Sequence, residues 1–275
     1  MRSLSVIWFA AAASALSPGG VLGGRVGGAG DPGSGKMELP PVTVRYTVQG
    51  AYEVQKAGTA AGREDFVRTY MSDNVVIYES VFEVIEGEGV TVSGNNRLEV
   101  EEDSGFPMAY YTRRNVHASD GETVREVTVR MFANVAVVAE RQEDEEKQRI
   151  VELPTGCLFV EGNIVHHIAE VLERYDRTAG GKQTFRAFDP LGVGMTDVSL
   201  EFVGDSTFVD AKGASAGPSL SGKMARYRYV AGISPAADVF VDAAGSIAAI
   251  NAPASSTDYV LVSIAKRTGK GAPEK

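Results

Sequence analysis

The amino-acid sequence predicts a mainly β protein: a large curved antiparallel sheet or half-barrel with one central amphipathic α-helix. Three observations support this prediction. Short runs of β-branched and aromatic residues alternate with polar residues through most of residues 42–266, which is the period of a strand with one buried face. Gly, Asn and Asp separate these runs, as they do at turns. One stretch, residues 163–177, instead repeats its apolar residues with the period of a helix.

Residues 1–15 have the pattern of a secretory signal peptide. Arg2 precedes an apolar run that ends in the sequence ASA at residues 13–15, an A-x-A cleavage pattern. The run is too short to span a bilayer comfortably as a permanent anchor, so no stable membrane span is expected once the signal peptide is cleaved. An uncleaved N-terminal anchor is the alternative. Residues 16–41 are rich in Gly and Pro and are expected to form a flexible linker. The sequence therefore predicts a periplasmic or secreted protein.

Residues 42–266 are expected to form a single β-rich domain, because no Gly- and Pro-rich linker divides them. Two separate β units are the alternative, and residues 267–275 are expected to be a disordered tail. Both GNN (94–96) and SDG (119–121) are interpreted as hairpin turns. The alternation predicts strands at 42–53, 62–71, 75–85, 89–100, 107–114, 123–131, 134–141, 148–153, 182–188, 196–203, 206–210, 222–231, 237–242, 246–251 and 258–266.

The predicted helix has an apolar stripe and a charged side. Successive helical residues are rotated by about 100°, which gathers five apolar side chains into one continuous stripe that is expected to face the sheet. The charged side chains fall elsewhere on the wheel and are expected to be solvated, with Glu170–Arg174 and Glu173–Arg177 as i,i+4 pairs. The stripe consists of Ile164, Ile168, Val171, Leu172 and Tyr175.

Two adjacent histidines in this helix are the first candidates for a functional site. His166 falls with the outer charges and His167 on the margin between charge and core, so their rings are not expected to converge. A helical metal pair uses i,i+4 spacing, which HHIAE lacks, and no metal or cofactor is predicted. His167 is interpreted either as a hydrogen-bonded boundary residue or, with Arg174 and Tyr175, as a ligand-binding residue at the mouth of a pocket.

Charge and cysteine content exclude some classes of function. The chain has 27 basic and 36 acidic residues, a net charge of −9, so general binding of nucleic acid is not expected. Its single cysteine, Cys157, allows no intramolecular disulfide, and no cysteine is placed to accept a lipid near residue 15. Cys157 is interpreted as a small buried apolar group, because no nearby base would activate its thiol.

The order of these segments resembles a known group of proteins. A signal peptide, many consecutive strands, one helix near 163–177 and further strands beginning KQTFRAFDP resemble exported bacterial envelope proteins with a LolA/LolB-like curved half-barrel. The resemblance covers residues 42–266 at the level of pattern. It implies that acyl chains are held between a concave sheet and a helical cover. The chain departs from the group in having one helix and no lipid-acceptor cysteine, and no catalytic residue is carried over.

A twisted sheet that curls around one helix leaves gaps at the margins of the helix, where ligands can bind. The sequence therefore predicts an exported carrier or binding protein for a hydrophobic or amphipathic small molecule. One alternative is a secreted hydrolase, isomerase or lyase, with His167 as general base oriented by a carboxylate such as that of Asp176. Another is a structural envelope protein that binds a partner chain through exposed edge strands.

Overall fold

The computed structural model describes residues 41–87, 89–161, 164–192, 194–208 and 222–268. The predicted signal peptide, nearly all of the predicted linker and most of the predicted tail lie outside these residues. Within them, fifteen strands form one sheet around a single α-helix. The predicted mainly β fold with one helix is confirmed, although β9 (Leu158–Phe159) is not predicted and Ser206, where a separate strand is predicted to begin, is the last residue of β11 (Gly194–Ser206).

The strands fall into two meanders separated by the helix. The first meander contains β1 to β8, and the second contains β10 to β15. The helix α1 spans Val165–Arg174 and follows the two-residue strand β9 (Leu158–Phe159). The bounds of the first meander are β1 Val44–Lys56, β2 Thr59–Met71, β3 Val75–Gly87, β4 Val90–Glu101, β5 Pro107–Ala118, β6 Gly121–Phe132, β7 Val135–Gln142 and β8 Glu145–Glu152. Those of the second are β10 Lys182–Asp189, β11 Gly194–Ser206, β12 Met224–Ala231, β13 Ala237–Val241, β14 Ile247–Ala252 and β15 Thr257–Thr268.

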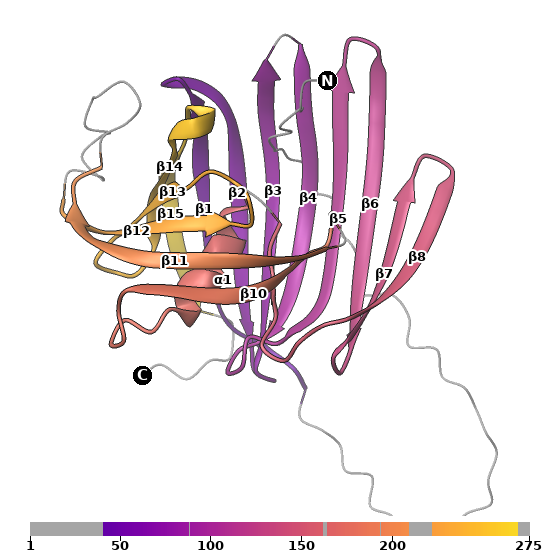
Figure 1. The fold of residues 1–275 in the computed structure, drawn as a ribbon, viewed down its shortest axis with the longest axis horizontal. Coiled ribbons are helices and arrows are strands. Elements are labelled where there is room, and N and C mark those ends of the chain that lie inside the picture. Colours follow the sequence, from indigo (N-terminus) through magenta and orange to yellow (C-terminus); the bar gives the residue numbers. More distant parts are fainter. Residues whose placement is uncertain (1–40, 88, 162–163, 193, 209–221, 269–275) are drawn as a thin grey trace, which may run out of the picture.

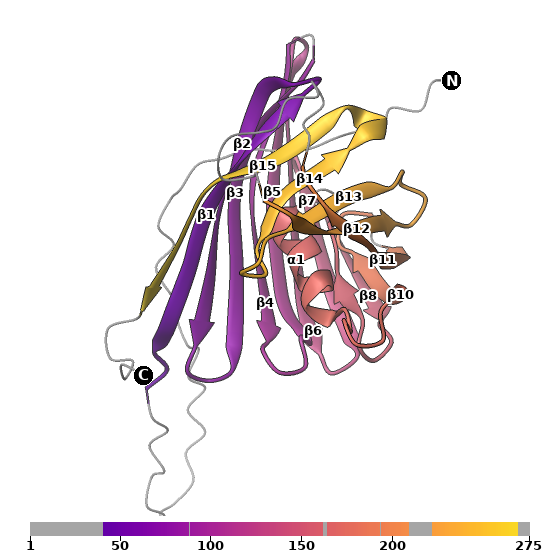
Figure 2. The ribbon, with the colours of Figure 1, turned by 90° about the vertical axis from the view of Figure 1, so that its left-hand side faces the viewer.

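The two meanders join through β1 and β15, which are the first and last strands along the chain. Their spatial order is β8-β7-β6-β5-β4-β3-β2-β1-β15-β14-β13-β12-β11-β10-β9. Every neighbouring pair is antiparallel except β9 and β10, which are parallel. The sheet is not closed, so β8 and β9 are its two edges. The long strands of β1 to β8 form a first wall, and β10 to β12 run across it as a second wall. The helix α1 lies between the two walls (Figures 1 and 2).

The helix is enclosed by this bent sheet rather than laid on one face of it. Every residue from Val165 to Leu172 is buried, including both histidines and Glu170. The predicted apolar stripe is confirmed as part of the larger core cluster, where it packs with side chains of both walls. The prediction of a solvated side is wrong for His166 and Glu170, because both are buried. The His166 side of the helix faces the first meander, where the His166 ring stacks on Tyr78 of β3 and lies near Glu64 of β2.

The turn predictions divide into one that is confirmed and one that is wrong. Residues 119–120 form the turn between β5 and β6, as predicted. The predicted turn at 94–96 instead lies inside β4. A Cβ at Gly94 would lie 2.1 Å from the carbonyl oxygen of Arg113 on β5, so this glycine permits a close approach of two strands rather than a turn. Asn96 is buried and donates a hydrogen bond to Ser80 Oγ at 2.9 Å.

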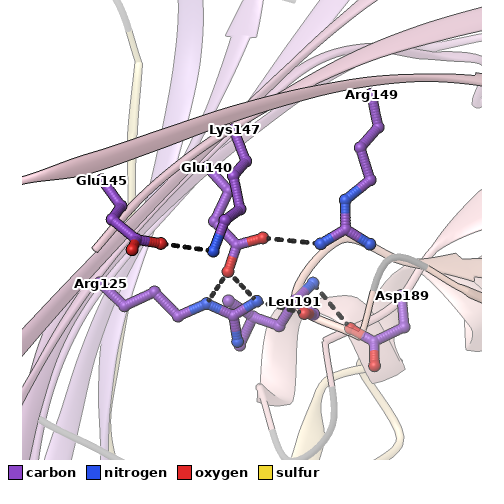
Figure 3. A network of polar contacts seen from close by, with 7 residues as sticks. All are labelled: Arg125, Glu140, Glu145, Lys147, Arg149, Asp189 and Leu191. Atoms are coloured by element: carbon purple, nitrogen blue, oxygen red, sulfur yellow. Dashed lines mark hydrogen bonds and ion pairs between the residues drawn. The ribbon is translucent and has the colours of Figure 1, made fainter.

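A polar network connects the two walls (Figure 3). Arg125 on β6 donates from Nε to Glu140 Oε1 at 2.8 Å and from Nη2 to the backbone oxygen of Leu191 at 2.6 Å. Arg149 on the edge strand β8 donates to the other oxygen of Glu140 at 3.2 Å. The turn after β10 is itself ordered by the Leu191 N–H, which donates to Asp189 Oδ1 at 3.0 Å. The β10–β11 turn is therefore fixed against the inner face of the first wall.

Candidate functional site

A cluster of ionisable side chains is buried between α1 and the first wall. Alternation along β2 and β5 points Glu64 and Arg114 to the inner face, in phase with buried Phe66 and Thr112. The segment before the helix adds Glu161, and α1 adds three side chains that a fully enclosed helix cannot expose. We call this set the interior polar cluster; its members are Glu64, Arg114, Glu161, His166, His167 and Glu170, each at most 8% exposed.

His167 has a defined tautomer. Its Nδ1 accepts a hydrogen bond from the backbone N–H of Glu161 at 2.7 Å. In the neutral ring the proton must therefore be on Nε2, which has no hydrogen-bond partner among the described residues. Burial lowers the pKa of His167 well below its ordinary value, and His166 and Arg114 lower it further. His167 is thus a neutral, buried donor, not the boundary residue that the sequence predicts.

His166 lies beside His167 and not on an outer face. The centroids of the two rings are 4.6 Å apart, and the His166 ring stacks on Tyr78 at 5.9 Å. Its Nδ1 is 3.7 Å from Glu64 Oε1, beyond hydrogen-bond distance, and neither ring nitrogen has a hydrogen-bond partner within the described part of the chain. Burial lowers the pKa of His166 well below its ordinary value. The predicted divergence of the two rings is therefore wrong, because the enclosing sheet brings both into the interior.

Glu64 and Glu170 are carboxyls held in a low-dielectric interior. Burial raises the pKa of each to about 8, although the Ser80 hydroxyl and the Val165 backbone N–H partly offset the effect at Glu64. The carboxyl oxygens of both residues form no hydrogen bond of normal geometry within the described residues. Both side chains are therefore largely protonated near neutral pH and can act as hydrogen-bond donors.

Arg114 and Glu161 form a buried ion pair between β5 and the segment that leads into α1. Arg114 also lies over the Phe82 ring, 5.7 Å from its centroid. Burial raises the pKa of Glu161 well above its ordinary value, and the charge of Asp189 raises it further. Since the Glu161 backbone N–H donates to His167, this pair positions the imidazole ring.

The structure does not bring the three residues predicted to bind a ligand together. Arg174 donates a hydrogen bond to the Ser104 carbonyl in the β4–β5 turn. The Tyr175 hydroxyl donates to Gly181 O at 2.7 Å and accepts from the Phe202 backbone N–H at 3.3 Å. The polar groups of Arg174 and Tyr175 are therefore engaged at the C-terminal end of α1, whereas His167 is in the interior.

The predicted pairs along the helix are also replaced by contacts to the sheet. Glu170 does not pair with Arg174, because its oxygens are buried without a hydrogen-bond partner in the described residues. Glu173 instead accepts hydrogen bonds from Arg68 Nη1 at 3.3 Å and from the Tyr78 hydroxyl at 3.1 Å. Contacts between helix and sheet thus take precedence over contacts within the helix.

An apolar pocket of about 300 Å³ opens at the end of the first wall, where the β4–β5 and β6–β7 turns meet the segment after β8. Its lining includes Cys157, which is 3% exposed and whose thiol has its pKa raised to about 11, mainly by burial. The prediction of a buried, unactivated thiol is confirmed. The lining residues are Phe106, Pro107, Met131, Ala133, Asn134, Leu153, Pro154, Thr155 and Cys157.

This pocket adjoins the core beside the interior polar cluster. Leu153 and Cys157 belong to the same core cluster as Tyr110, whose hydroxyl is buried without a hydrogen-bond partner among the described residues. The Tyr110 ring lies 5.7 Å from the His167 ring. Glu170 is near enough to Cys157 for its charge to raise the pKa of the thiol. Polar atoms without partners among the described residues therefore lie in or beside the core cluster that supplies Leu153 and Cys157 to the pocket.

Sequence reasoning missed Glu64, Arg114 and Tyr110. A usable signal exists for the two charged residues. Glu64 is in phase with Phe66 along β2, and Arg114 is in phase with Tyr110 along β5, so each charge falls on the apolar face of a strand. A charged residue on such a face is unusual enough to mark it as a candidate.

The comparisons with known proteins support the fold alone. No family model and no curated protein matches the chain. Among solved structures, it is similar to the crystal structure of a β-barrel-like protein of the domain of unknown function DUF1849 from Brucella abortus. The similarity has a TM-score of 0.51 at 8% identity and covers 81% of this chain and 97% of that one. It supports a curved, barrel-like fold and does not confirm the resemblance to LolA/LolB-like proteins.

Two features are absent from the described residues. In them, no group of three or more His, Cys, Asp or Glu side chains is arranged to hold a metal ion. Within the same residues, no helix has both the length and the apolar character needed to cross a membrane.

Proposed function

We propose that this protein binds a small amphipathic molecule. The apolar part of the ligand occupies the pocket beside Cys157, and its polar part reaches the side chains of α1 and β5 behind that pocket. The observation that carries this proposal is the position of the pocket, which opens on a core cluster containing a buried hydroxyl without a partner. A role outside the cytoplasm is part of the proposal and is supported by the signal-peptide pattern of residues 1–15.

The size and lining of the pocket support a small ligand. Its volume of about 300 Å³ falls at the lower end of the range typical of small-molecule sites, which are mostly apolar with a few polar groups. Leu153, Met131 and Cys157 supply apolar surface, and Asn134 and Thr155 lie at its polar margin. Such a pocket suits a medium-length alkyl chain or a small aromatic molecule.

The buried polar atoms supply a reason for a ligand. Each buried donor or acceptor without a partner costs about 1–3 kcal/mol of folding free energy. Three such groups are buried without a hydrogen-bond partner among the described residues: His167 Nε2, the Tyr110 hydroxyl and the Glu170 carboxyl. A ligand that satisfied them would recover part of that cost on binding, whereas structural packing alone gives no reason to retain them.

The enzyme alternative lacks one of its required parts. Asp176, the carboxylate suggested to orient His167, accepts hydrogen bonds from the backbone N–H groups of Thr178 and Ala179 at 2.8 and 3.1 Å. The Nδ1 of His167 is already an acceptor for Glu161 N–H, which leaves Nε2 as a donor and not as a base. The geometry therefore favours binding over general-base catalysis.

A displacement experiment tests the proposal. Purified protein is titrated with N-phenyl-1-naphthylamine, whose fluorescence rises in apolar sites, and Thr155→Trp is compared with Thr123→Trp. Thr155 is an exposed residue at the pocket, so a large side chain there fills the opening, whereas Thr123 is an exposed residue near the start of β6. We expect saturable binding that Thr155→Trp weakens at least about tenfold and Thr123→Trp preserves. Absence of saturable binding, or equal binding by both variants, would refute the proposal.

The sole cysteine provides an independent measurement of the same site. Since Cys157 lines the pocket, a bound molecule should shield its thiol. Alkylation by iodoacetamide at pH 9, followed by intact mass spectrometry, is expected to be slower in the presence of N-phenyl-1-naphthylamine. An unchanged alkylation rate at saturating probe would place the probe elsewhere.

A further inference from the structure

We infer that the ligand carries a carboxyl group, whose two oxygens accept hydrogen bonds from His167 Nε2–H and from the Tyr110 hydroxyl. This inference rests on the proposed function, because it assigns the polar end of the molecule whose apolar end fills the pocket beside Cys157. It names a chemical class that the fold comparison does not supply.

The first donor is fixed by backbone geometry. The Glu161 N–H donates to His167 Nδ1 at 2.7 Å, so Nε2 carries the proton of the neutral ring. The ring is 1% exposed, and Nε2 has no acceptor in the part of the chain that the structure describes. Because the Arg114–Glu161 ion pair holds the segment that donates to Nδ1, the orientation of this N–H is preorganised.

The second donor lies beside the first. Tyr110 is 1% exposed, and its hydroxyl has no hydrogen-bond partner within the described ranges. Its ring centroid is 5.7 Å from that of His167 and 6.1 Å from that of Phe159, which belongs to the core cluster on which the pocket opens. The hydroxyl thus lacks a partner among the described residues, in the same core cluster as the pocket residues Leu153 and Cys157.

Glu170 supports the same head group. It follows His167 by three residues, which places both on the same side of α1. Burial raises the pKa of Glu170 to about 8, so near neutral pH its carboxyl is mostly protonated and can donate to a carboxylate oxygen. Arg174 opposes this rise in pKa and Glu173 adds to it.

The opposite head group, an ammonium, would need acceptors that are already engaged or neutralised. Glu161 is paired with Arg114. Glu170 must lose a proton before it can accept from a cation, which costs free energy at pH 7. A carboxyl group instead offers two acceptor oxygens to two donors that have none, whereas an alcohol offers only one oxygen.

The test compares three ligands with the same ten-carbon chain: decanoic acid, decan-1-ol and decylamine. Their affinities for the full chain are measured by isothermal titration calorimetry at pH 7, with Tyr110→Phe as the variant. Tyr111→Phe is the matched control, because Tyr111 is the next residue of β5 and points to the opposite face of the sheet. Thermal unfolding of each variant checks that it is folded, and the removal of one hydroxyl preserves the ring in both.

We expect decanoic acid to bind most tightly, and Tyr110→Phe to weaken its binding about tenfold or more, as loss of a hydrogen bond to a charged group does. Tyr111→Phe should leave all three affinities unchanged. Equal affinities for the three ligands, or an unchanged affinity of Tyr110→Phe for decanoic acid, would overturn the inference but leave the proposed function standing. Failure of all three ligands and of N-phenyl-1-naphthylamine to bind would overturn both.

Discussion

Burial shifts the protonation of several side chains around α1. Glu64 and Glu170 are raised in pKa to about 8, and His166 and His167 are lowered, so near neutral pH four buried ionisable groups are largely uncharged. Charging any of them inside the sheet costs free energy, because few dipoles are available to replace water. The stability of the fold should therefore depend on pH in a way that single substitutions can isolate.

Glu170→Gln is expected to change the pH dependence of stability. The pKa of Glu170 is about 8 in the folded state against a reference of 4.5, so between these values the folded state binds more protons than the unfolded state. The contribution of Glu170 is then greatest below about pH 4.5 and is lost as pH rises towards 8. Glutamine does not titrate. The variant should gain stability relative to the wild-type protein by up to about 1.4 kcal/mol per pH unit in this window.

Urea denaturation at pH 5, 6, 7 and 8 measures this difference. The control is Glu146→Gln, since Glu146 is exposed on β8. A stability difference between Glu170→Gln and wild type that stays constant with pH would contradict the prediction.

The Arg114–Glu161 ion pair makes a second prediction at this scale. Arg114→Met leaves the Glu161 carboxylate buried without its counter-charge and should destabilise the protein by about 3–5 kcal/mol. The double variant Arg114→Met with Glu161→Leu removes both charges and should recover most of that loss. Chemical denaturation of the two single variants and the double variant measures the coupling. Strictly additive effects would show that the two residues do not interact.

At the level of single residues, the sequence correctly predicts the burial of side chains where burial follows from the local sequence pattern. The burial of Cys157 and of the stripe that includes Ile168 and Val171 is of this kind. His166 and Glu170 were misplaced because a helical wheel assumes that one side of the helix faces water. The first meander covers the side that carries His166, while the apolar stripe packs in the core with side chains of both meanders, and nothing in residues 163–177 reports this enclosure.

Among the elements, the β10–β11 turn and α1 show how the two walls are held together. The turn is fixed to the first wall by Arg125, and the C-terminal end of the helix by Arg174 and Glu173. Each is a contact between segments distant in sequence. These contacts, together with the core around α1, set the angle at which one meander crosses the other.

Arg125→Ala is expected to free the β10–β11 turn without unfolding either meander. The substitution removes the hydrogen bond from Arg125 to Leu191 O and the contact to Glu140. Hydrogen exchange of residues 189–192, read by mass spectrometry, should become faster, because a turn with fewer hydrogen bonds opens more often. Arg130→Ala is the control, as Arg130 is exposed on the opposite face of β6. Equal exchange in both variants would show that Arg125 does not restrain the turn.

Considered as a whole molecule, the fold is a long strip of strands with two edges. Among the described residues, no strand pairs with the outer side of β8, whose side chains are largely charged and exposed. Charged edge strands discourage pairing with other chains. The alternative of partner binding through an edge is therefore less favoured at β8 than at an apolar edge.

Replacing Lys147 and Arg149 by Val should make this edge associate. The double substitution leaves an uncharged β-branched run on β8, and such a run at an open edge promotes pairing between molecules. Light scattering over a range of concentrations is expected to give a higher mass than for wild type. Lys147→Gln with Arg149→Gln is the control, because it removes the charges and keeps the polarity. Masses equal to wild type in both variants would contradict the prediction.

The sequence predicts the strands and the helix of this fold better than it predicts how the two meanders pair. Alternation of apolar and polar residues locates nearly all of the strands, and the helical period of the apolar residues locates the helix, because both patterns are local. The pairing of β1 with β15 has no local signal, because its partners, such as Val48 and Lys266, come from opposite ends of the β-rich region. For the same reason the interior polar cluster was not predicted, as Glu64, Arg114 and His167 meet only when both meanders are in place.

The pairing of β1 with β15 has a topological consequence. Tyr46 near the start of β1 lies opposite Thr268 at the end of β15, so a short peptide could connect these strands as a hairpin. A circular permutant with this connection, and with new ends between β8 and β9, would list its strands in the same order along the chain as across the sheet. Its most distant pairing would become a neighbouring one, so its loop-closure entropy should fall and its refolding should accelerate.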